Sequence, residues 1–89
     1  MPCLEFANGT KPDQSAVQNF TLGRDVFSVK FEMAQFVATP RGFLVVYTGQ
    51  AATGQAFYMS MYYSFYGEWL AKFIDRAPEQ PPHPSRLAN

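Results

Sequence analysis

The stretch FYMSMYYSFYGEW, residues 57–69, decides how this chain folds, because its apolar side chains repeat with one period before Ser64 and with another after it. Counting in twos over the first part places an apolar set on one face of a strand: Phe57, Met59, Met61 and Tyr63. The other face of that strand carries hydroxyl groups: Tyr58, Ser60 and Tyr62. Tyr58, Tyr62 and Tyr66 also fit a helix, but Tyr and Phe suit a pleated surface better. We therefore predict a strand over about 55–64.

After Ser64 the spacing becomes helical. Phe65, Trp69, Phe73 and their neighbours Leu70 and Ile74 fall on one face of a helix, with charged residues on the other face. Ser64 is a suitable N-cap, and Pro78 would end the helix. This pattern predicts a helix over about 65–77 that packs on one face of the sheet and buries Trp69 and Phe73.

Two further strands precede this segment. In residues 25–38, apolar side chains alternate with polar ones as far as Met33, and the phase then slips, so that Phe36 falls on the side of Lys30 and Glu32. A β-bulge near Ala34 and Gln35 would produce that slip. The sequence TPRG at 39–42 predicts a turn, and FLVVYT predicts a central strand over 42–48 because it is apolar on both faces.

The two ends of the chain are less regular. The N-terminal part could hold a short strand over 3–6 or a short helix over 14–20 capped by Asp13. Residues 78–89 are rich in proline, so we expect a flexible tail after a single domain over 1–77. Together these elements predict an α+β fold, a three-stranded antiparallel meander with a C-terminal helix on one face.

Composition excludes several function classes. The 89 residues include seven basic and seven acidic side chains, so the net charge is zero and nothing favours nucleic acid or an anionic membrane surface. Cys3 is the only cysteine and His83, in the tail, the only histidine, which is too few for a metal site or a nucleophile–histidine pair. We expect no cofactor and no enzymatic activity. Because Met1 is followed by no apolar run and no segment could cross a bilayer, we expect a cytoplasmic protein.

The hydroxyl-bearing face of the sheet is the candidate functional surface. Aromatic residues make up 17% of the chain and charged residues only 16%, and a single helix could cover only one face of the sheet. Tyr is enriched where proteins associate, so we predict a homodimer, or contact with another protein, through Tyr58, Ser60, Tyr62 and Phe36. The alternatives are a cleft between sheet and helix that binds a small apolar or aromatic ligand, and a face simply covered by the N-terminal segment.

Overall fold

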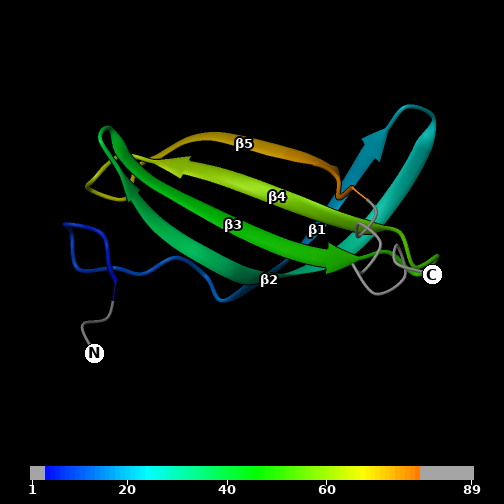
Figure 1. The fold of residues 1–89 in the computed structure, drawn as a ribbon, viewed down its shortest axis with the longest axis horizontal. Coiled ribbons are helices and arrows are strands. Elements are labelled where there is room, and N and C mark those ends of the chain that lie inside the picture. Colours follow the sequence, from blue (N-terminus) through cyan, green and yellow to red (C-terminus); the bar gives the residue numbers. More distant parts are fainter. Residues whose placement is uncertain (1–3, 79–89) are drawn as a thin grey trace, which may run out of the picture.

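The computed structural model describes residues 4–78, and over that range it contains five strands and no helix. Each strand pairs antiparallel with the next one along the chain, so the order across the sheet is the order in sequence. Figure 1 shows that the sheet curls into a half-barrel, with β1 passing behind the other strands. The strands are β1 (Ser15–Leu22), β2 (Asp25–Thr39), β3 (Gly42–Gln50), β4 (Ala56–Tyr63) and β5 (Trp69–Arg76).

The three strands predicted from the sequence are confirmed to within two residues, as β2, β3 and β4. The predicted bulge is confirmed as well, because the pairing between β2 and β3 shifts register between Met33 and Gln35. The predicted turn joins β2 to β3, with Pro40 and Arg41 as its central pair. The Thr39 hydroxyl closes this turn by accepting a hydrogen bond from the Arg41 amide at 3.2 Å.

The predicted C-terminal helix, and with it the α+β fold of three strands, is wrong. Residues after Ser64 form a turn in which Gly67 has a φ of 86°, and the chain then returns along β4 as β5. Ser64 does accept amide hydrogen bonds, from Tyr66 at 3.2 Å and from Glu68 at 3.1 Å, but it closes this turn rather than a first helical turn. Trp69 and Phe73, predicted to be buried, are 62% and 57% exposed.

The N-terminal predictions are wrong too. The segment predicted as a helix over 14–20 forms most of β1 from Ser15 onwards, and Leu4 to Phe6 form no strand. Gly23, with a φ of 62°, and Arg24 make the two-residue turn to β2, a hairpin loop in which glycine provides the positive φ. The predicted tail over 78–89 falls, except for Pro78, outside the described residues. No helix in the described range is long and apolar enough to cross a membrane.

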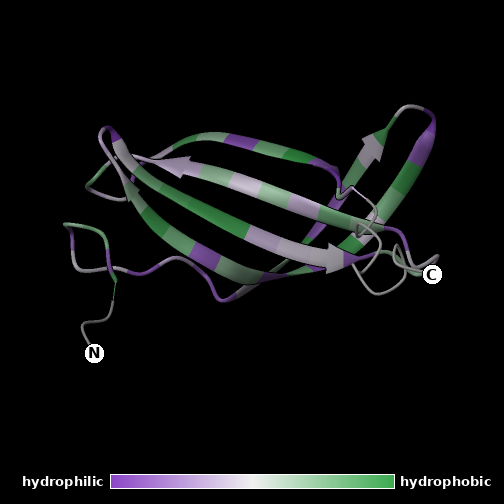
Figure 2. Cartoon of the chain, viewed as in Figure 1, coloured by the Kyte–Doolittle hydropathy of each residue, from purple (hydrophilic) through white to green (hydrophobic). Residues whose placement is uncertain are grey.

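The core lies on the concave side of the curled sheet. Alternation along β2, β3 and β4 directs large side chains to the concave side. The curled sheet itself covers these side chains there, whereas the sequence predicted that a helix would cover them. The residues in the first half of β3 are apolar on both faces of the strand. Figure 2 shows this half of β3 in green. The residues buried in this core are Val29, Phe31, Val45, Tyr47, Ala51, Phe57 and Met59.

The two ends of the half-barrel differ. At one end the N-terminal segment folds back and inserts the buried Phe6 ring against Phe36, Phe43 and Tyr63, with ring centroids 4.8–5.6 Å apart. The Ala7 amide secures this segment by donating to the Phe65 carbonyl at 2.7 Å. The opposite end, where the β1–β2 turn, the β3–β4 loop and the end of β5 meet, has no such plug among the described residues. One end of the concave core is therefore closed and the other is open.

The edge strands β1 and β5 come close without forming a ladder within residues 4–78. Lys72 on β5 donates a hydrogen bond from Nζ to the Gln18 side-chain oxygen on β1 at 3.0 Å. Arg76 at the end of β5 lies 3.9 Å from the Asp25 carboxylate at the start of β2. Side chains rather than backbone groups thus connect this edge of the sheet with β1 and β2. The backbone groups on the outer side of β5 have no strand partner among residues 4–78.

Candidate functional site

The convex face of the sheet carries a continuous apolar area, which we call the convex patch. The strand registers place four residues, Val37, Leu44, Tyr62 and Ala71, in one row across β2 to β5. The next row contains Gln35, Val46, Ser60 and Phe73 in the same way. Neither row contains a charged residue. The convex patch consists of Val37, Leu44, Val46, Tyr58, Ser60, Tyr62, Ala71 and Phe73.

Much of this patch faces solvent. Tyr62 is 45% exposed and Phe73 is 57% exposed, and Val37 is similarly accessible. The third row, which contains Tyr58, ends in Glu32 on β2 and in Asp75 on β5. The N-terminal half of β2 carries Lys30, whose ammonium lies 3.6 Å from the Glu32 carboxylate. The convex face is therefore divided into a charged part and an uncharged apolar part.

The structure brings three of the four sequence-predicted residues together. Tyr58, Ser60 and Tyr62 project from β4 to the convex side, as alternation predicted. Phe36 does not join them, because the bulge in β2 turns its side chain to the concave side, where its ring lies 5.4 Å from Phe6 and 4.9 Å from Phe43. Phe36 is therefore a core residue. The predicted cleft between sheet and helix does not form, since β5 replaces the helix.

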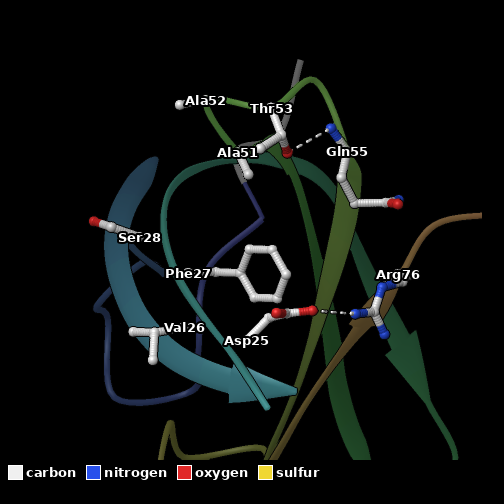
Figure 3. Close-up of a pocket in the computed structure, with 9 residues that line it drawn as sticks. All are labelled: Asp25, Val26, Phe27, Ser28, Ala51, Ala52, Thr53, Gln55 and Arg76. Atoms are coloured by element: carbon white, nitrogen blue, oxygen red, sulfur yellow. Dashed lines mark hydrogen bonds and ion pairs between the residues drawn. The ribbon is translucent and has the colours of Figure 1, made fainter. Parts of the chain in front are cut away.

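A cavity of about 580 Å³ lies at the open end of the half-barrel (Figure 3). The Phe27 ring points into it, and this ring also packs 4.8 Å from Phe57 of the core. Asp25 and Arg76 border one side of the cavity, and the β3–β4 loop borders the other. Its lining residues are Asp25, Val26, Phe27, Ser28, Ala51, Ala52, Thr53, Gln55 and Arg76.

Two tyrosines on the concave side, Tyr47 and Tyr63, have raised pKa values. Tyr47 is buried, and its hydroxyl donates to the Asp13 carbonyl at 2.7 Å, which holds the chain before β1 against the core. Burial raises the pKa of Tyr47 to about 12, with the charges of Tyr63 and Asp13 adding to the rise. Burial and Asp13 also raise the pKa of Tyr63. Over residues 4–78, no three His, Cys, Asp or Glu side chains come together as metal ligands would.

The Tyr47 hydroxyl predicts a loss of stability at high pH. The folded protein keeps a proton at this position that the unfolded chain loses at the ordinary tyrosine pKa of 10.0. Stability from this group is therefore complete below pH 10 and is lost as the pH rises towards 12. We expect urea unfolding midpoints to fall over that interval, and to fall less steeply for Tyr47→Phe, which has no proton to lose. Equal slopes for the two proteins would contradict this assignment.

Several residues of these surfaces escaped the sequence analysis. The sequence predicts Phe73 on a helix, and it predicts Leu44 and Val46 only as parts of a central strand. Gly23, a glycine at the first of two loop positions, is compatible with a two-residue hairpin loop and could have indicated β1 and, with it, the fifth strand. The cavity joins residues from three distant segments, so no local signal marks it. The chain matches no protein-family model, no curated protein and no solved structure.

Proposed function

We propose that this protein is a small, non-enzymatic, cytoplasmic protein that acts by self-association through the convex patch. The observation that carries the proposal is the uncharged area spanning four strands, with Tyr62 and Phe73 exposed on adjacent strands. Water-exposed apolar areas of this kind mark association surfaces in soluble proteins. Tyr58 and Ser60 would supply polar groups beside the apolar contact, as the rims of protein interfaces do.

A second copy of the chain suits this surface. The chain has no net charge, so two copies experience little overall repulsion. The face of one twisted sheet packs readily on the face of another. From ordinary strand and residue spacings, the two uncharged rows across four strands, together with Tyr58, cover about 300 Å², roughly a third of what each partner buries in a standard interface. We therefore expect a weak, concentration-dependent dimer rather than a permanent one.

Placing a charge in the middle of the patch tests the proposal. Tyr62→Lys would leave a desolvated cation in the interface, because neither of the two uncharged rows contains a carboxylate that could pair with it. We expect the dissociation constant of the dimer to rise about tenfold or more, measured by sedimentation equilibrium across a dilution series. Circular dichroism would verify that the variant is folded.

Tyr66→Lys is the matched control, because Tyr66 is an exposed tyrosine in the β4–β5 turn and lies outside the patch. It should leave the dissociation constant unchanged. A wild-type chain that stays monomeric up to millimolar concentration would overturn the proposal. An equal effect of both lysine substitutions would show that association does not use the convex patch.

A further inference from the structure

The cavity at the open end combines an aromatic floor with a polar border. The Phe27 ring, which stacks on Phe20 with ring centroids 5.6 Å apart, points into the cavity, and Ala51 lines it as the first residue of the β3–β4 loop. The volume of about 580 Å³ falls within the range of small-molecule sites, which occur in the mouths of β-barrels. This end of the core is open in the described chain, whereas Phe6 fills the other. A ligand could therefore reach aromatic surface here without any rearrangement of the strands.

Arg76 is the charged group that borders this floor. Its guanidinium carbon lies 5.7 Å from the centre of the Phe27 ring, within reach of a cation–π contact. Its ion pair with Asp25 is long, at 3.9 Å, and the Arg76 and Asp25 side chains are 45% and 72% exposed to solvent. Exposed pairs of this kind are weak, so the guanidinium remains available to another anion. A carboxylate can take two parallel hydrogen bonds from it, which the present geometry with Asp25 does not provide.

The opposite border carries hydrogen-bonding groups of both kinds. The Thr53 hydroxyl accepts from the Gln55 amide at 3.5 Å, which is a long bond, and it still has a proton to donate. The Gln55 side chain donates its amide to the Ala56 carbonyl at 2.8 Å, so its oxygen remains as an acceptor. In Figure 3, Thr53 and Gln55 border the cavity on the side opposite Asp25 and Arg76. A ligand with a flat centre and a negative end would match both borders.

We propose that this cavity binds a small aromatic carboxylate. The carboxylate replaces Asp25 as the partner of Arg76, and the aromatic ring lies against Phe27 on the side of Ala51. Thr53 and Gln55 are placed to contact a polar substituent on the far side of the ring. This binding site is separate from the convex patch, so the proposal does not rest on self-association.

Benzoate is the simplest probe of this site. We expect saturable shifts of the amide signals of Phe27, Ala51 and Arg76 in NMR spectra recorded at fixed ionic strength. Acetate, which lacks the ring, and benzyl alcohol, which lacks the charge, should bind at least tenfold more weakly. Arg76→Gln should weaken benzoate binding about tenfold, and Asp25→Asn should strengthen it severalfold because it removes the competing carboxylate.

Arg41→Gln is the matched control, since Arg41 is an exposed arginine in the β2–β3 turn and does not line the cavity. It should leave benzoate binding unchanged. Absence of saturable shifts with benzoate would overturn the proposal, as would equal affinity for acetate and benzoate. Shifts centred on Tyr62 and Phe73 would place the ring on the convex patch instead, and would overturn it as well. If Arg76→Gln lost its native spectrum, the response to Asp25→Asn would still decide the question.

Discussion

Replacing Phe57 by alanine is expected to lower the free energy of unfolding by about 3–5 kcal/mol, the range measured for removing a buried phenylalanine. Phe57 is fully buried on the concave side of β4, and its ring lies 5.2 Å from Phe20 and 4.8 Å from Phe27. It therefore connects β4 with both strands of the first hairpin. A small domain has only about 5–15 kcal/mol of stability in total, so this variant should be largely unfolded at moderate urea concentration.

Phe73→Ala is the informative comparison. If a helix packed on the sheet, Phe73 would be buried, and Phe73→Ala would lower the free energy of unfolding as much as Phe57→Ala does. As an exposed residue of the edge strand, Phe73 should contribute less than about 1 kcal/mol to the stability of the monomer. Urea unfolding followed by tryptophan fluorescence, at a concentration low enough to avoid association, would measure both variants. Similar losses for Phe57 and Phe73 would contradict the five-stranded sheet.

Gly49→Ala is expected to destabilise the protein by about 3 kcal/mol through overpacking. Gly49 lies on the concave side of β3, where it pairs with the buried Phe57 of β4. A Cβ atom there would stand 2.5 Å from the Lys30 carbonyl oxygen and 2.7 Å from a Val29 methyl carbon. Because the nearer atom belongs to the backbone, a side-chain rotation cannot relieve the clash, and β2 would have to move.

Thermal unfolding of Gly49→Ala beside Thr48→Ala would test this expectation. Thr48 is the neighbouring residue on β3, is exposed and faces the opposite side of the sheet. Its truncation should change the melting temperature by only a few degrees. A Gly49→Ala variant as stable as the Thr48 variant would show that the close approach between β2 and β3 is not needed for the fold.

The sequence predicted β2 and β4 from alternation and β3 from a run that is apolar on both faces. One side of β4 is buried and the other is not, so period two is plain from Phe57 to Tyr63, and the bulge of β2 was visible as a slip in phase. The convex position of Tyr58 and Tyr62 followed from the same alternation. The alternation does not identify a partner that covers Tyr58 and Tyr62, so the association surface stays a prediction.

The error in β5 has a specific physical origin. The pairing between β4 and β5 shifts register so that Leu70 is the extra residue between Trp69 and Ala71. Trp69 and Leu70 lie at this bulge, whereas Phe73 and Ile74 pair with Ser60 and Met59 and therefore face opposite sides of the sheet. Apolar residues from the bulge and from both faces of the strand thus fall at the spacing of a helical face. Periodicity also assumes that apolar residues are buried, whereas three of these four are exposed on an edge strand.

The one-sided attachment of β5 has a thermodynamic consequence. This strand has a backbone partner only in β4 within the described chain, and most of its side chains are exposed. Local opening of such an element requires less free energy than global unfolding. Opening would remove Phe73 from the convex patch and Arg76 from the cavity in one event. A ligand held by Arg76 and a second chain seated over Phe73 would each oppose that opening, so the two binding events would carry a favourable coupling free energy.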